Sequence, residues 1–346
     1  MTGSSDPSSN PSSKRVGGSS PPPSSWLERL RSADLIFQLT LLLIFLGAFA
    51  FLSFTAPNFF TLNNQLNILR QAAAILIVAV GMTFVITSAG IDLSVGSGLA
   101  VIAVLSAVTL GAGWPVWLAV VAMLALGVAI GLFNGFFIAY QGIPSFIVTL
   151  AMLSALRGVA QVITQGYSVP IDPNSPFLTI GRGRLFDIPV PALVAVAVVV
   201  IGWIVLNQTR FGTYVTGIGS NEEAVRRAGI NTRVIKMAVF AISGLTMAVG
   251  GMVTAARLAS GSSYTGVAFE LQVIAAVIVG GTNLFGGEGR MFGTVLGTLL
   301  IAMIANGLIL MNISPFYQQI IEGAIILLAI WFNTYLSGRR LEASKQ

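Results

Sequence analysis

The first stretch that could carry chemistry places a carboxylate between two long apolar runs, at Asp92 in Ala89–Gly96. Gly90 and Gly96 flank it, and glycine permits backbone that is not helical. Irregular backbone at membrane depth is tolerated only where it is buried in protein or faces a water-filled cavity. One interpretation is a helix break that lines a transport pathway or its gate, formed by Gly90, Asp92, Ser94 and Gly96. The other, compatible with it, is that Asp92 caps the next helix by accepting backbone N–H bonds.

A second glycine-rich stretch, Gly280–Gly289, separates two later apolar runs. Aligned with the first stretch it repeats Gly, Leu and Gly, and Asn283 falls opposite Asp92. Two glycine-interrupted breaks in the two halves of a membrane protein point to a transport pathway. It is not a nucleotide-binding fingerprint, because no strand precedes it and no βαβ unit surrounds it. We therefore assign three of its residues to the pathway or gate: Gly281, Asn283 and Gly287.

The only substantial hydrophilic stretch between apolar runs covers 209–231. Asn221 can cap a helix, acidic residues follow in the first turn, Arg226 and Arg227 suit the last turn, and Gly229 can stop it. The pattern predicts a short surface helix over 221–230 that docks into a partner, with a solvated loop helix as the alternative. Its candidate contact residues are Asn221, Glu222, Glu223, Ala224, Arg227 and Gly229.

Several polar side chains stand inside apolar runs, where ionisable groups are costly and usually face the bundle interior or a cavity. Arg157 with Glu270 or Glu322 forms a candidate structural pair. The candidate polar lining comprises Asn134, Gln161, Asn306 and Glu322. Glycines spaced four apart favour close helix packing rather than a ligand site; they are Gly127, Gly131, Gly293 and Gly297.

The residue types that are missing exclude several classes of function. The chain has no Cys and no His, which removes thiolate nucleophiles, zinc–thiolate sites and Ser–His chemistry. A P-loop needs Gly-Lys-Ser/Thr, and none of Lys14, Lys236 and Lys345 follows a glycine. We therefore expect no metal site, no cofactor and no ATP site in this chain. Any ATP energy must come from a partner.

The elements that position these residues follow from composition. Of 346 residues, 55% are hydrophobic and 9% are charged, whereas a soluble domain carries about 25% charged residues. The chain is therefore predicted to be an all-α, polytopic transmembrane bundle, with a disordered Ser/Pro-rich tail at 1–25, a membrane domain at 26–338 and a tail at 339–346. About ten spans are expected, with nine or eleven as alternatives because the second and eighth are short: 35–54, 71–88, 95–111, 116–139, 145–165, 190–207, 234–256, 268–281, 291–311 and 317–336.

Basic residues predict the orientation of these spans. With the N-terminus in the cytoplasm, 13 of the 18 Lys and Arg residues fall in inside segments, as the positive-inside rule requires. Both termini are then cytoplasmic, and the 166–189 loop is the main external element. The other five basic residues lie in outside segments (Arg182, Arg184 and Arg257), at a span boundary (Arg70) or within a span (Arg157). The net charge of +6 is explained by this topology and does not indicate nucleic acid.

These motifs together resemble the permease subunits of bacterial ABC sugar importers of the ribose type, a group related to branched-chain amino-acid permeases. The resemblance covers about residues 30–336, and it is carried by Gly90–Gly96, by Gly219–Ala224 with Ala228–Ile230, and by Gly280–Gly287. The sequence departs from the family where Tyr214-Val215-Thr216 stands, since an Arg is expected soon after the Phe211-Gly212 pair.

The resemblance implies an importer in the bacterial inner membrane that carries a monosaccharide. Its partners would be an ABC ATPase, with two ATP-binding domains in one fused chain, an extracytoplasmic sugar-binding protein and a second permease copy in a homodimer. The 221–230 segment would be the cytoplasmic coupling helix, seated in a cleft of the ATPase. Alternatives are another solute, such as a branched-chain amino acid or nucleoside. A further alternative is a secondary transporter driven by an ion gradient, for which Asp92, Glu270 and Glu322 are the candidate carboxylates.

Overall fold

The computed structural model describes residues 33–314 together with Tyr317, Ile320, Ile321, Gly323, Ala324, Leu327 and Trp331. The chain divides into two compact units, Met1–Leu39 and Thr40–Gln346. In the first unit the described residues are the opening turns of a helix, and everything below concerns the second. The predicted tails at 1–25 and 339–346, Glu322 and most of the expected span at 317–336 lie outside the described residues.

The described part of the chain is dominated by helices. They are α2 (Ala33–Thr55), α3 (Leu62–Thr87), α4 (Val95–Gly111), α5 (Val116–Ala139), α6 (Ser145–Thr164), α7 (Thr179–Arg182), α8 (Val190–Gln208), α9 (Arg210–Arg227), α10 (Thr232–Leu258), α11 (Phe269–Val279) and α12 (Met291–Leu310). Seven described helices are long and apolar enough to cross a membrane, and α4 and α11 are shorter apolar helices. The prediction of an all-α, polytopic membrane protein is confirmed, whereas a count of about ten spans stays a prediction.

The predicted start of the second span, at residue 71, is wrong, because α3 begins at Leu62. Thr61 caps the helix, with its side chain accepting the N–H of Asn64. Asn64 in turn donates to the Asn306 side chain at 2.9 Å. These polar first turns lower the apolar content that signals a span, so the sequence pattern placed the boundary too late.

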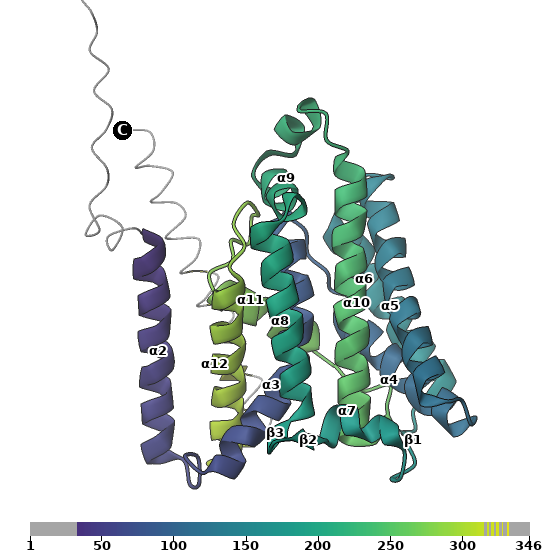
Figure 1. The fold of residues 1–346 in the computed structure, drawn as a ribbon, viewed down its shortest axis with the longest axis vertical. Coiled ribbons are helices and arrows are strands. Elements are labelled where there is room, and N and C mark those ends of the chain that lie inside the picture. Colours follow the sequence, from purple (N-terminus) through teal and green to yellow (C-terminus); the bar gives the residue numbers. More distant parts are fainter. Residues whose placement is uncertain are drawn as a thin grey trace, which may run out of the picture. The chain divides into compact units, whose positions relative to one another are not determined.

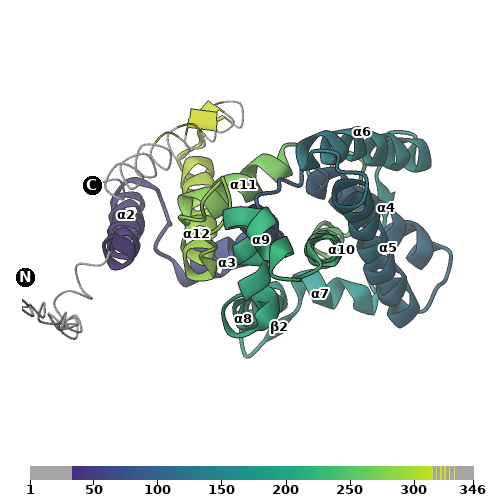
Figure 2. The same cartoon turned by 90° about the horizontal axis from the view of Figure 1, so that it is seen from above.

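Helix α10 lies at the centre of the bundle and packs against α3, α4 and α5 (Figure 2). Glycines allow its backbone to approach α5 closely: a Cβ on Gly127 would lie 2.4 Å from the Gly244 carbonyl oxygen, and one on Gly131 would lie 2.2 Å from the Phe240 carbonyl oxygen. A similar approach joins α11 and α12 through Gly293. The prediction that these spaced glycines serve helix packing is confirmed.

The 166–189 connection is folded rather than extended. It contains β1 (Val169–Pro170), the 3₁₀ turn η1 (Pro176–Leu178), α7, β2 (Arg184–Leu185) and β3 (Ile188–Pro189). Strand β1 pairs antiparallel with β4 (Ser260–Gly261), and β2 pairs antiparallel with β3. Figure 1 shows these elements at the end of the bundle opposite α9. The 166–189 connection, which was predicted to be external, and α9, whose end was predicted to be cytoplasmic, therefore lie at opposite ends of the bundle.

Candidate functional site

Three glycine-bearing segments converge at the α9 end of the bundle. We call residues Ser88–Ser94, between α3 and α4, the first break, and Gly280–Arg290, between α11 and α12, the second break. The N–H of Gly287 donates to the carbonyl oxygen of Thr87, the last residue of α3, at 3.0 Å. A Cβ on Gly219 of α9 would lie 1.9 Å from that same oxygen and 2.4 Å from the Gly287 nitrogen. All three sequence motifs therefore meet at one point.

On the side of the second break, the contact is made by glycine backbone. A Cβ on Gly286 would lie 2.7 Å from the Ala89 Cβ, and one on Gly289 would lie 2.2 Å from the Thr87 Oγ1. Gly281, Gly286 and Gly287 adopt φ values of 86°, 88° and 82°, a region that side chains disfavour. Glycine is therefore required in the second break for both its backbone conformation and the close approach.

The glycines of the first break serve a different purpose from the one expected. Neither Gly90 nor Gly96 has a positive φ; Ala89 is the left-handed residue, at 60°. A Cβ on Gly90 would lie 3.3 Å from Val85, and one on Gly96 would lie 2.1 Å from the Glu270 Oε2. Both glycines therefore provide room for neighbouring side chains and backbone rather than an unusual backbone conformation.

Asp92 is only 2% exposed, and donors satisfy both of its carboxylate oxygens. Oδ1 accepts the backbone N–H of Ser94 at 3.0 Å and the Ser94 hydroxyl at 2.6 Å. Oδ2 accepts the hydroxyl of Ser243 on α10 at 2.8 Å. Asn134 of α5 extends the network by donating to Ser94 Oγ at 2.9 Å. Asp92 thus fixes the chain entering α4 and ties the first break to α5 and α10.

The second break holds itself together locally. Asn283 Oδ1 accepts the N–H of Phe285 at 3.1 Å, and the Asn283 N–H donates to the Glu288 carbonyl at 3.0 Å. The Arg290 N–H donates to Thr282 Oγ1 at 3.2 Å. Asn283, which is half-buried, therefore repeats the local turn of Asp92 without a described bond from its side chain to another helix.

The predicted short helix is present at the end of α9. Asn221 has extended backbone (φ −161°, ψ 94°), so α9 consists of two helical parts joined by a kink. The Asn221 side chain accepts the N–H of Ala224 at 3.0 Å, which is the expected cap. Gly229 follows the last turn with φ 83°. The start and stop signals read from the sequence therefore form the helix they predict.

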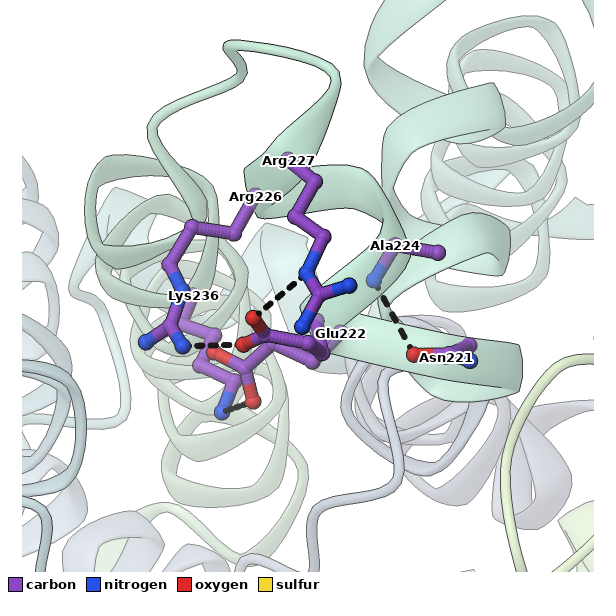
Figure 3. Close-up of polar contacts among 7 residues, drawn as sticks. Asn221, Glu222, Ala224, Arg226, Arg227 and Lys236 are labelled. Carbon is purple, nitrogen blue, oxygen red and sulfur yellow. Dashed lines mark hydrogen bonds and ion pairs between the residues drawn. The ribbon is translucent and has the colours of Figure 1, made fainter.

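The charges on this short helix pair within the chain, as Figure 3 shows. Glu223 forms ion pairs with Arg226 and Arg227, and Glu222 pairs with Lys236 of α10. The Arg226 and Arg227 side chains remain 67% and 78% exposed, and Ala224 is exposed. The exposed surface of the helix therefore combines a small residue with two cations that are paired to the partly exposed carboxylate of Glu223.

A cavity of about 1070 Å³ opens beside the short helix. The first break contributes Ser88–Ile91 to its wall, the connection between α5 and α6 contributes 139–146, and Glu222 and Lys236 contribute from the short helix and α10. Gly90 therefore lines a cavity, whereas Asp92 lies behind the wall. The first break satisfies both conditions for irregular backbone, since one part faces a cavity and the other is buried in protein.

Of the remaining polar residues predicted from the sequence, only Asn134 is bonded to either break. Asn134 is fully buried in the Asp92 network, and Asn306 is bonded to Asn64. Gln161 is exposed on α6 and lines none of the described cavities. The Arg157 guanidinium donates to backbone carbonyls of the loop before α11, at Ser263, Thr265 and Gly266. It thereby links α6 to that loop rather than forming a described ion pair.

Sequence reasoning missed several residues that build the site. Ser243 supplies a donor to Asp92, Thr87 supplies the shared acceptor, and Lys236 pairs with the short helix. Ser243 carries a weak signal, because it is a polar residue inside an apolar run. Thr87 carries none, since its backbone carbonyl makes the contact.

Comparison with known proteins places this arrangement in a family. Residues 64–330 match the family described as the branched-chain amino acid transport system permease component. The ribose import permease protein of Haemophilus influenzae is 41% identical over 295 residues, covering 84% of this chain and 91% of that protein. The ribose import permease protein of Bacillus subtilis is 40% identical, covering 83% and 90%. The xylose transport system permease protein of Escherichia coli is 35% identical, covering 81% and 87%.

No solved structure gives a significant match to the chain. The family match spans all three converging motifs, from the first break through the short helix to the second break. The relatives are transport components, and each is matched over most of its length. The chain therefore belongs to the family of branched-chain amino acid transport system permease components and is a permease subunit of the ribose type rather than an enzyme.

Proposed function

We propose that this chain is the membrane permease of an ATP-driven importer that carries a monosaccharide into a bacterial cell. The names of its relatives support the substrate class, since they import ribose or transport xylose. The α9 end would face the cytoplasm, and the end that holds α7 would face outward. The excess of Lys and Arg in the segments assigned to the inside supports this orientation.

One observation carries the mechanism, namely the contact of Gly219 with the end of α3 and with the second break. Gly219 lies in the first helical part of α9, two residues before the Asn221 kink that leads into the short segment Glu222–Arg227, and it touches Thr87 and Gly287 through backbone. A displacement of the short helix that is carried through Asn221 to Gly219 would press on the end of α3 and on the second break, because Gly219 has no side chain that could absorb the movement. Packed contacts of this kind switch between discrete arrangements rather than deform continuously.

The partner that moves the short helix would be an ABC ATPase, because this chain has no P-loop lysine. The exposed Ala224 would let the ATPase approach closely, and Arg226 and Arg227 would meet its acidic groups. Two ATP-binding domains, in one fused chain, would drive two copies of this permease, which together enclose the pathway. An extracytoplasmic binding protein would deliver the sugar to the α7 end.

The coupling assignment is tested with Ala224→Trp. We expect the variant to insert normally, to lose co-purification with its ATPase and to lose ATP-dependent uptake, in proteoliposomes, of the monosaccharide that the binding protein delivers. Ala112→Trp, at an exposed position in the α4–α5 connection, is the matched control and keeps both activities. If Ala224→Trp assembles with the ATPase and takes up the sugar as well as the wild type does, the assignment of this segment as the coupling helix is wrong. Uptake driven by a proton or sodium gradient without ATP would refute the importer class.

Orientation is tested by cysteine labelling, since the native chain contains no Cys. Asn174 and Ala228 are both exposed and lie at opposite ends of the bundle. A membrane-impermeant maleimide should label Asn174→Cys in intact cells and should label Ala228→Cys only after the cells are opened. The reverse pattern would place the short helix outside the cell and end the coupling proposal.

A further inference from the structure

At the end of the bundle opposite α9, arginines from three parts of the chain surround one cavity of about 560 Å³. Arg70 comes from α3, Arg257 from the last turn of α10, and Arg182 and Arg184 from the folded 166–189 connection. Asn67 and Gln71 complete the polar part of the wall. Among the described residues of its wall none is acidic, so every charged side chain described there is a cation.

Two of these arginines each have a buried nitrogen that lacks a hydrogen-bond partner. Arg70 and Arg257 are half-buried, and the Nε atom of each is buried without a hydrogen-bond partner. Among the described residues neither guanidinium forms an ion pair, and the two charges are close enough to repel each other. Burying a cation without a counter-charge is costly. The protein therefore maintains two cations without a described counter-charge in the wall of one cavity.

The rim of the cavity is held in place. Arg182 Nε donates to the Arg257 carbonyl oxygen at 2.8 Å, and a Cβ on Gly181 would lie 2.2 Å from the Arg257 nitrogen. Helix α7 therefore rests directly on the end of α10. Arg184 is exposed on β2, where the β2–β3 pairing fixes its backbone. Because α7 and β2 are anchored, the positions of the cations around the cavity are built into the fold.

The basic cavity shares part of its wall with a second cavity inside the bundle. Gln71, Arg257 and Leu258 also line a second cavity of about 350 Å³ between α3, α4, α10, α11 and α12. Thr254, Thr265 and Gln272 add polar groups there, and Phe269 adds an aromatic ring. Amide and hydroxyl groups beside an aromatic face suit the hydroxyls and the C–H face of a sugar ring, whereas guanidinium groups bind carboxylates through paired N–H donors.

We propose that this pair of cavities binds a monosaccharide that carries a carboxylate, with Arg70 and Arg257 on the carboxylate and the inner cavity on the hydroxyls. The inference rests on the import function proposed above and narrows its substrate class to sugar acids. Its basis is the position of the cations: Arg257 lines both cavities, and Arg70 lies in the wall of the first. An acidic side chain of a docked protein would meet the exposed Arg184 on the rim instead.

The test is direct binding to the purified full-length permease in lipid nanodiscs, measured by calorimetry at low salt. The probes are glucuronate, galacturonate and mannuronate, each beside its neutral parent hexose, with acetate as the simple anion. We expect at least one hexuronate to bind about tenfold or more tightly than its parent hexose and than acetate. Arg70→Gln should weaken the binding of that hexuronate about tenfold and leave the affinity for the parent hexose unchanged.

Matched variants keep the test sharp. Arg184→Gln removes a rim cation of the same cavity and should change hexuronate affinity less than threefold, and Arg210→Gln at the other end of the bundle should change nothing. If Arg70→Gln fails to fold, Arg70→Lys keeps the charge but not the paired donors and should show an intermediate loss. Thermal unfolding of each unliganded variant reports folding separately.

Three results would overturn the inference. These are the absence of hexuronate binding, equal binding of hexuronate and parent hexose or acetate, and an Arg70→Gln effect confined to capture of the binding protein. The last would assign the arginines to protein docking. ATP-driven uptake of a neutral sugar by the assembled importer is measured separately, so the proposed function can stand while this inference fails.

Discussion

Each break contains a side-chain oxygen that accepts the backbone N–H two residues later, Asp92 from Ser94 and Asn283 from Phe285. Beyond that shared turn the two breaks are held differently. Asp92 has a second oxygen on Ser243 of α10, and its partner Ser94 accepts a bond from Asn134 of α5. Asn283 shows no such bond to another helix among the described residues, and its segment is closed by its own backbone.

This difference in bonding indicates which helices should move together with each break. The first break is bonded to α5 and α10, so it should move with them as one body. The second break touches Thr87 and α9 through close-packed glycine backbone and one backbone hydrogen bond, from Gly287 to Thr87. This contact can separate without leaving a buried charge unpaired. We therefore expect the boundary between the two breaks, rather than either break itself, to be where the permease changes shape.

Removing the carboxylate of the first break should have the largest effect. Asp92→Leu leaves the N–H and hydroxyl of Ser94 and the hydroxyl of Ser243 without their acceptor in a buried site. We expect a loss of folding stability on the order of 3–5 kcal/mol, seen as a lower thermal midpoint and less protein in the membrane. Asp92→Asn, which keeps an acceptor for Ser94, should recover most of it. A stable but inactive Asp92→Leu protein would show that the carboxylate acts in transport instead.

A side chain at the boundary between the breaks should have the next largest effect. Gly219→Ala places a methyl group against the Thr87 oxygen and the Gly287 nitrogen, and overpacking of this kind costs about 1–3 kcal/mol. Because α9 must then shift away from both breaks, we expect ATP hydrolysis by the assembled importer to continue while uptake falls. Gly158→Ala on α6, where a Cβ meets nothing within 4 Å, is the matched control. Equal uptake by both variants would contradict the boundary assignment.

Removing the side chain of the second break should have the smallest effect. Asn283→Ala deletes one hydrogen bond in a half-buried turn whose backbone bonds remain. We expect a loss of about 0.5–1.5 kcal/mol, measured by thermal unfolding beside Asp92→Asn. A loss as large as that of Asp92→Leu would show that the two breaks are held alike after all.

Local patterns were predictable where the interacting groups are near one another in sequence. The Asn221 cap, the charges of its helix and the Gly229 stop all lie within one short segment, and that helix formed as expected. The boundaries of most apolar helices followed from composition for the same reason. The start of α3 was missed, because its first turns are polar and include Asn64, which bonds to Phe59 and to Asn306 of α12.

Long-range partners could not be predicted. The sequence marks Asp92 as unusual, but nothing near it identifies Ser243 as its donor or Asn134 as the next member of the network. Likewise, Arg70 and Arg257 look like unrelated residues at the ends of apolar runs until the fold brings them to one cavity. Helix packing brings these distant residues into contact, and packing depends on the whole set of side chains rather than on any one motif.

The bond between Asp92 and Ser243 also places a demand on synthesis. Ser243 follows Asp92 by 151 residues, and at a translation rate of about 5–20 residues per second the ribosome needs roughly 8–30 s to make that stretch. For that time the α3–α4 hairpin lacks its α10 partner, and the Asp92 oxygen has only local donors or water. The Asp92 carboxylate must therefore stay hydrated, near the insertion machinery, while the rest of the chain is made. Its bond to Ser243 can form only after α10 has entered the membrane.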